Sequence, residues 1–192
     1  MRQVDPSLRP QLRVSPEQLK LMSFGPRREI IAALANDADL SARDLAERTR
    51  RPVTGLYRHL SLLLKSGLIR ECGQRPGPKR PEALYALTFA TFSAIEATAT
   101  NEGRAALAEA AARYAGATTR KLKSAIQTGA ARLTGADANA GYGNMDLQLD
   151  RAGLAEFHRL MGEFIVAARK LRVRRAADAE TVSVVILFAP TL

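Results

Sequence analysis

The chain has 192 residues, enough for one full domain or for a small domain with an accessory one. Hydrophobic residues make up 46% of it and charged residues 25%, which excludes a disordered or collagen-like chain. It carries 29 Lys and Arg against 19 Asp and Glu, and this formal net charge of +10 favours a polyanionic partner. An anionic membrane surface or the arginine bias of a GC-rich genome would also account for the excess. The position of the excess charge in the chain favours nucleic acid as the partner, because residues 1–90 hold 16 of the cations and only 9 of the anions.

The chain offers little for covalent or metal chemistry. Cys72 is the single cysteine, which excludes an intrachain disulfide and a cysteine-built zinc or iron–sulfur site. No His, Asp and Glu set has metal-ligand spacing, and His158 has no recognisable nucleophile beside it. We therefore expect no catalytic residue, no cofactor and no metal. The lack of an apolar run long enough to span a bilayer, and of a secretory signal, predicts a cytoplasmic protein without a membrane partner.

Four helices are predicted in the first third of the chain, after an N-terminal arm over residues 1–14. The run Ser15–Gln18 has the pattern of a capping box and starts the first helix, and Pro26 opens the second. Ser41 and Asp44 bracket the start of a short third helix. The fourth follows a tight turn, carries leucines at helical spacing, and ends at Gly67.

Two strands are predicted after the helices, at residues 68–72 and 83–87, with a loop between them that is rich in Pro and Gly. Two short helices joined by a tight turn and followed by a hairpin with a basic tip are typical of a winged helix-turn-helix. The sequence therefore predicts such a domain over residues 15–88, in a mainly α protein of the α+β class.

The same segment resembles the ArsR-like bacterial transcriptional regulators. The resemblance covers residues 16–88 and is carried by Pro26–Leu34, Leu45–Glu47, Tyr57–Leu60 and Ser66–Ile69. It implies a DNA-binding regulator, with repression as the expected mode. The sequence departs from the family where Pro52 stands in place of the usual Ser or Thr cap. Because the third helix also lacks the cysteines of the metal-sensing members, the resemblance does not extend to metal sensing.

Candidate DNA contacts lie on the fourth helix and in the turn before it. Arg58 can pair bidentately with a guanine, and the alternatives are a phosphate or a neighbouring carboxylate. Arg50 and Arg51 are placed for phosphates, while His59 suits a structural role or a phosphate contact better than catalysis. The other side chains expected on the base-reading face are Val53, Thr54 and Tyr57.

The hairpin loop adds a second candidate contact. Arg75, Lys79 and Arg80 are predicted to form a basic tip, stiffened by prolines, of the kind that a narrow minor groove attracts. The alternative is an ordinary solvated loop.

Residues 89–134 are Ala-rich and predict a short helix followed by a long one after Asn101. The long helix carries a narrow apolar stripe at steps of three and four residues, which something must cover. The stripe consists of Leu107, Ala111, Tyr114, Thr118, Leu122 and Ile126. The same helix of a second subunit is the commonest cover, so this region predicts a homodimer on an inverted-repeat operator.

The remaining residues, 135–192, predict a small strand–helix–strand extension. The strands are expected at 144–149, which alternates, and at 181–188, which is nearly all apolar, with a helix capped by Asp150 between them. The helix stripe of Phe157, Met161 and Phe164 is typical of core and would alternatively line a pocket for a small organic effector. The predicted function is thus a transcriptional regulator, and the alternative is a winged helix used for protein–protein or RNA contact.

Overall fold

The computed structural model describes residues 11–37, 39–77, 80–171 and 180–189. The chain divides into two compact units, one made by residues 1–118 with 185–192 and the other by residues 119–184. None of the described helices is long and apolar enough to cross a membrane.

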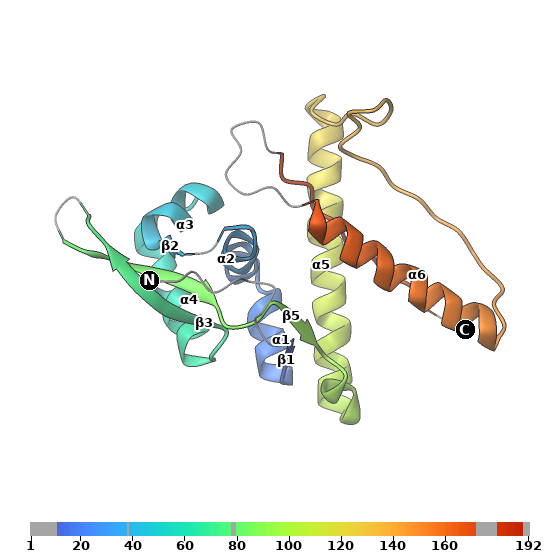
Figure 1. Ribbon diagram of the computed structural model, residues 1–192, viewed down its shortest axis with the longest axis horizontal. Coiled ribbons are helices and arrows are strands. Elements are labelled where there is room, and N and C mark those ends of the chain that lie inside the picture. The colour runs from blue at the N-terminus through green and yellow to red at the C-terminus, as the bar shows by residue number, and fades with distance from the viewer. Residues whose placement is uncertain (1–10, 38, 78–79, 172–179, 190–192) are drawn as a thin grey trace. The chain divides into compact units, whose positions relative to one another are not determined.

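Residues 16–87 of the first unit form four helices and a small antiparallel sheet. β3 (Ile69–Arg75) and β4 (Glu82–Leu87) pair as a hairpin, and β2 (Leu40–Ser41) pairs with β4, so that the order is β2-β4-β3. Figure 1 shows this hairpin, the wing, beside α3 and α4. The helices are α1 (Pro16–Ser23), α2 (Gly25–Asn36), α3 (Ala42–Thr49) and α4 (Val53–Lys65). The winged helix-turn-helix predicted from the sequence is confirmed, and β2 is an additional strand.

The helix boundaries follow the side chains that satisfy the first backbone N–H groups. The Ser15 hydroxyl accepts from the Gln18 N–H at 3.2 Å, and the Gln18 side chain accepts from the Ser15 N–H at 3.0 Å. Ser41 and Asp44 form the same box at α3. α4 has only Pro52 at its N-cap position and no side-chain cap, as expected from the sequence. It is followed by Gly67 at φ +70°, the left-handed region that glycine enters without a Cβ clash.

The core of this unit is built from α1, α2, α3, α4 and the wing strands. Leu56, Leu60 and Leu63 of α4 are each 1% exposed or less, and they pack with Ile30 of α2 and Leu45 of α3 in one cluster. Burying a leucine of this kind contributes about 1.5–3 kcal/mol, so α4 is held firmly by its inner face. Its outer face is consequently presented on a rigid support.

Residues 11–14, the described part of the N-terminal arm, belong to the fold. β1 (Gln11–Arg13) pairs in parallel with β5 (Thr91–Ser93), and the Val14 N–H donates to the Ser93 carbonyl at 3.0 Å. Instead of the predicted short helix over 89–100, the structure has β5 and a 3-10 turn, η2 (Glu96–Ala99). Local composition favoured a helix here, but pairing with a strand some eighty residues earlier overrides that preference.

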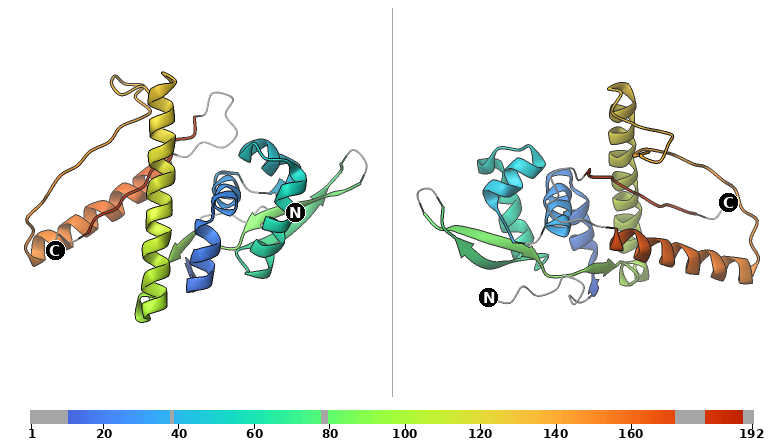
Figure 2. Two further views of the ribbon diagram at one scale, coloured as in Figure 1. Left: turned by 180° about the vertical axis from the view of Figure 1, so that it is seen from behind. Right: turned by 45° about the horizontal axis from the view of Figure 1, so that its top comes forward.

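The long helix α5 (Asn101–Gln127) is confirmed, but the first half of its apolar stripe is already covered by its own domain. Leu107, Ala111 and Tyr114 of the stripe are half-buried, and the Tyr114 hydroxyl donates to the Met22 carbonyl of α1 at 3.4 Å. Beside them on α5, Gly103, Ala106 and Ala110 are buried. Figure 2 shows α1 and α2 between the wing and this part of α5. The expectation that the whole stripe lies open was wrong, because small residues at 103, 106 and 110 allow close packing within the chain.

The second unit is dominated by α6 (Arg151–Lys170), whose predicted cap is confirmed: the Asp150 carboxylate accepts from the Gly153 N–H at 2.7 Å. No residue of α6 is buried. The strands predicted at 144–149 and 181–188 are not formed. An alternating pattern shows that a segment can be buried on one face, but a strand also needs a hydrogen-bonding neighbour, and the described residues supply none.

Candidate nucleic-acid interface

The outer face of α4 carries the side chains expected to read bases. Thr54 and Arg58 are exposed and Tyr57 is 49% exposed, whereas Val53 is half-buried at the first position of the helix. Ser61 and Lys65, which sequence reasoning did not single out, continue this face by one and two further turns. Their spacing from Arg58, by three and seven residues, is a signal that could have identified them.

Arg58 is available for an external ligand. Among the described residues it has no carboxylate within ion-pair distance, which removes one of the alternatives weighed for it. Guanine and phosphate remain as ligands that match its five donors.

The two arginines in the turn between α3 and α4, Arg50 and Arg51, have different surroundings. Arg51 makes two bonds to the Glu29 carboxylate of α2, at 2.6 and 3.3 Å, and these raise the pKa of its guanidinium. Arg50 ends α3 in the left-handed region, at φ +53°, and is exposed. Arg51 thus holds the turn against α2, while Arg50 is the turn arginine that remains open to a phosphate.

His59 lies at the side of α4 against α2. Its ring centroid is 5.9 Å from that of Phe24, and its Nδ1 is buried with no hydrogen-bond partner among the described residues. Burial lowers the pKa of His59, and the charges of Arg27, Arg51 and Arg58 lower it further. A neutral, half-buried imidazole is a weak phosphate ligand, which favours the structural role considered for it.

Arg27 is a candidate contact that sequence reasoning missed. Its guanidinium lies 4.4 Å from the Phe24 ring centroid, and burial together with the charges of Arg113 and Arg58 lowers its pKa. Like charges that perturb one another concentrate positive potential at this surface. The available signal was the Arg27–Arg28 pair in the first turn of a helix, where cations oppose the helix dipole.

The structure corrects the position of Arg75, which the sequence placed at the wing tip. Arg75 ends β3 and binds Ser41 at 2.9 Å, Asp44 at 2.8 Å and Glu82 at 3.0 Å. Burial alone would raise the pKa of Asp44, but hydrogen bonds from Arg75 and Ser41 outweigh it and lower that pKa. The hairpin carries the arginine into reach of these carboxylates because β3 extends beyond the predicted strand end. Arg75 therefore ties the loop end of the wing strands to the cap of α3.

Two further cations, Lys79 and Arg80, were predicted at the wing tip. Arg80 is exposed and has no ion pair among the described residues, as a groove contact requires. Lys79 lies outside the described residues.

Comparison with known proteins identifies the central part of this unit. A family model described as a helix-turn-helix domain matches residues 26–72. Residues 26–72 form a helix-turn-helix domain. The matched segment contains α2, α3, α4 and the start of β3, so it includes Arg50, Arg51 and Arg58. A helix-turn-helix domain indicates a DNA-binding regulator.

Two other comparisons add little to this assignment. No curated protein matches the chain in sequence. Among solved structures, the crystal structure of RV1404 from Mycobacterium tuberculosis matches with 18% sequence identity and a TM-score of 0.30, covering 84% of this chain and 82% of that one.

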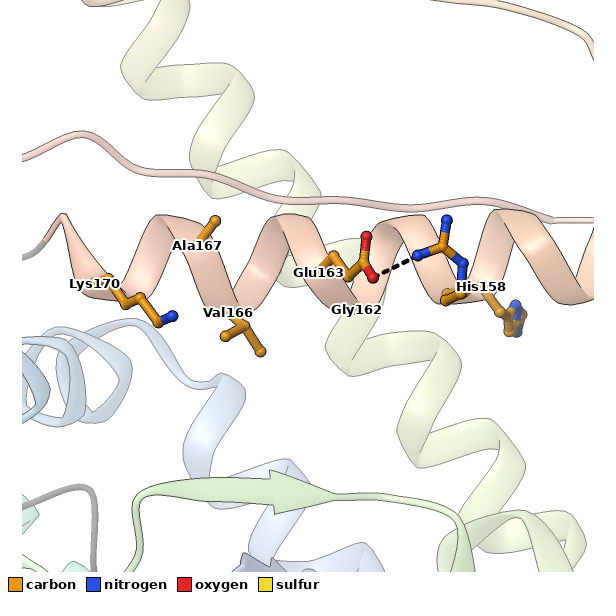
Figure 3. Close-up of a pocket in the computed structure, with 7 residues that line it drawn as sticks. His158, Gly162, Glu163, Val166, Ala167 and Lys170 are labelled. Atoms are coloured by element: carbon orange, nitrogen blue, oxygen red, sulfur yellow. Dashed lines mark hydrogen bonds and ion pairs between the residues drawn. The ribbon is translucent and has the colours of Figure 1, made fainter.

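A shallow depression in the second unit is the candidate place for an effector. It is lined only by one side of α6, including His158, Glu163, Val166 and Lys170, with an ion pair between Arg159 and Glu163 (Figure 3). A small-molecule site is normally concave and lined by several elements. The depression is accordingly an exposed face of a single helix, and the apolar stripe with Phe164 lies on the opposite face.

Proposed function

We propose that this protein is a transcriptional regulator that binds an inverted-repeat operator in duplex DNA as a homodimer, with α4 in the major groove. The observation that carries the proposal is the outer face of α4, which presents Thr54, Tyr57 and Arg58 while its inner face is locked into the core. Rigid support is what base reading requires, because a misplaced side chain loses the bidentate geometry on which discrimination rests.

The surrounding charges support duplex DNA as the partner. Arg27 and Arg50 flank α4 and suit phosphates, and Arg80 lies at the wing beyond the Arg75 contacts. Phosphate contacts position a protein on DNA, and base contacts then supply the sequence preference. Repression, the resemblance to ArsR-like regulators, a cytoplasmic location and the absence of catalysis are parts of the same proposal.

Dimerisation, which the sequence predicts through residues 102–132 with a contribution from 89–100, is part of the same proposal. The part of α5 available for it is the second half, where Leu122 is half-buried and Ile126 is 47% exposed. Two-fold symmetry would set the two recognition helices about one DNA turn, roughly 34 Å, apart.

The first experiment separates base reading from general attraction. Genomic fragments bound by the purified protein are selected, and affinities for the selected site and for an unrelated duplex are measured by fluorescence anisotropy. Arg58→Ala should weaken the specific site by about 1–3 kcal/mol and the unrelated duplex much less. Arg151→Ala, an exposed arginine outside this unit, serves as the matched control and should change neither affinity.

A salt titration tests the wing. Arg80→Ala and Lys79→Ala should weaken both duplexes alike and flatten the plot of log affinity against log salt by about 0.9 for each lost phosphate contact. Arg75→Ala should weaken binding with less change in slope, because its guanidinium is held by Asp44 and Glu82. If the wild-type protein shows no salt-dependent affinity for any duplex, the proposal is wrong and a protein or RNA partner for the winged helix becomes the better explanation.

A further inference from the structure

The second unit exposes far more apolar surface than a folded chain normally leaves open. Nine large apolar side chains, here named the C-terminal apolar surface, are each between 39% and 74% exposed. They are Met145, Leu147, Leu149, Leu154, Leu160, Phe164, Ile165, Val182 and Val184. Together they expose on the order of 800 Å², more than the roughly 300–600 Å² of the largest apolar patch on a typical monomer.

The apolar and charged side chains of α6 lie on separate faces of the helix, which indicates that the apolar face is covered by a partner. On α6, Leu154, Leu160 and Phe164 recur on one face, whereas Arg159 pairs with Glu156 and Glu163 on the other. Such segregation is typical of a helix that buries one face, yet no residue of α6 is buried.

The extended segments that precede and follow α6 in the sequence indicate which kind of partner covers this surface. Residues 145–149 and 182–186 alternate or run apolar as strands do, yet no strand is formed in either. Their backbone N–H and C=O groups need a hydrogen-bonding strand once the apolar side chains are covered. A lipid surface cannot supply those bonds, and a small ligand cannot span both segments. A polypeptide that brings a strand is the kind of partner that meets both needs.

We propose that the C-terminal apolar surface is completed by the same surface of a second copy of this chain, with the extended segments of the two copies pairing under their α6 helices. A second copy brings the required strands in equal number and can pair them across a two-fold axis. The exposed area agrees with this occupant, because a standard interface buries roughly 800 Å² on each partner. The proposal rests on the homodimer of the proposed function but not on DNA binding.

The competing location for the dimer contact is α5, and the structure weakens it. The first half of α5 is packed on α1 and α2, and Ile126 is the one large apolar side chain of α5 that is exposed. A single exposed isoleucine gives only a small fraction of a standard interface. The C-terminal apolar surface is accordingly the main contact, and α5 contributes beside it.

The test is sedimentation velocity of the full chain over a concentration series, with charge introduced on each surface. Phe164→Asp and Val184→Asp should each raise the dimer dissociation constant at least about 30-fold, as expected for central interface residues. Val166→Asp is the matched control, because Val166 is 52% exposed against 49% for Phe164 but lies on the opposite face of α6. It should change the constant less than about 3-fold.

Amide hydrogen exchange provides a second readout that does not depend on a variant folding. In the wild-type dimer the amides of residues 145–149 and 182–186 should exchange slowly, and dilution to monomer should remove that protection. Fast exchange of these amides in the dimer would overturn the proposal. A wild-type protein that is monomeric at tens of micromolar would also overturn it, whether or not that monomer binds anionic vesicles. Equal effects of Phe164→Asp and Val166→Asp on the dissociation constant would overturn it as well.

The outcomes also separate this proposal from the proposed function. If Ile126→Asp breaks the dimer and Phe164→Asp does not, the second-copy contact is wrong while DNA binding stands. If Phe164→Asp breaks the dimer but the wild-type protein binds no duplex, the contact stands and the proposed function is wrong.

Discussion

The two units of this chain use similar sequence patterns and reach different states. In the winged helix-turn-helix, α4 buries Leu56, Leu60 and Leu63 to 1% exposure or less, and both wing strands pair. In the second unit, α6 has an apolar face of similar quality and leaves Leu160 at 47% exposure, while its flanking segments stay unpaired. The spacing of apolar residues shows which face of a helix or strand can be buried. Whether that face is buried depends on a neighbouring element, which the spacing does not identify.

The largest expected difference concerns the leucines. Leu60→Ala should lower the unfolding free energy of the winged helix-turn-helix by about 2–5 kcal/mol, because it leaves a cavity in a closed core. Leu160→Ala should change that transition by less than about 0.5 kcal/mol. Urea unfolding at a concentration where the chain is monomeric measures both. Equal effects would mean that α6 is part of the same core, which would remove the contrast between the units.

A pair of helix glycines sharpens the contrast. A Cβ on Gly103 would lie 1.8 Å from the Ala97 carbonyl oxygen, whereas a Cβ on Gly162 of α6 would meet nothing within 4 Å. Gly103→Ala should therefore destabilise the first unit by about 1–3 kcal/mol through overpacking. Gly162→Ala should increase the helicity of α6, which circular dichroism measures, at a gain of about 1 kcal/mol or less. A stable Gly103→Ala protein would show that α5 does not pack closely on η2.

The helix caps give a smaller difference. Ser41→Ala removes a capping hydroxyl that also accepts from Arg75, and should lower the unfolding free energy of the first unit by about 0.5–2 kcal/mol. Asp150→Ala removes the matched cap of α6 and should leave that transition unchanged. Thermal unfolding followed by near-ultraviolet absorption of the tyrosines, three of which lie in the first unit, reports the comparison. A lower midpoint for Asp150→Ala would contradict the independence of the units.

The smallest effect is a pH dependence confined to the first unit. Burial and three arginines hold the pKa of His59 below the ordinary value of 6.5, so the folded chain binds fewer protons there than the unfolded chain. Stability from this group is present above pH 6.5 and is lost as the pH falls through the lowered pKa. His59→Gln should therefore reduce the loss of stability between pH 7 and pH 5. An unchanged pH profile would show that the burial of His59 has no energetic consequence.

The sequence predicts the features that depend on neighbouring residues and does not predict those that depend on distant ones. The capping boxes at Ser15 and Ser41, the end of α4 near Gly67 and the wing strands depend on residues close in sequence, and all were predictable. The parallel pairing of β1 with β5 joins residues about eighty positions apart, and no local pattern indicates it. Long-range pairing is chosen by the whole fold, which is also why the extension lacked its predicted strands.

The candidate interface shows the same limit at the level of single charges. The sequence identified the cations of α4, the turn and the wing, but it could not show which of them carboxylates would engage. Glu29 holds Arg51, and Asp44 with Glu82 holds Arg75, whereas Arg50, Arg58 and Arg80 have no such partner among the described residues. Ion pairing across elements is set by tertiary packing, so it becomes visible only in the folded chain.

The contacts of Arg75 have a consequence for how the protein would meet a duplex. Through Ser41, Asp44 and Glu82, this one guanidinium connects the loop end of the hairpin strands to the start of α3, the helix that precedes α4. The angle between hairpin and recognition helix is therefore set when the chain folds. Docking on a double helix would then cost little further conformational entropy in the hairpin, because the hairpin and α4 are already held as a single preorganised body.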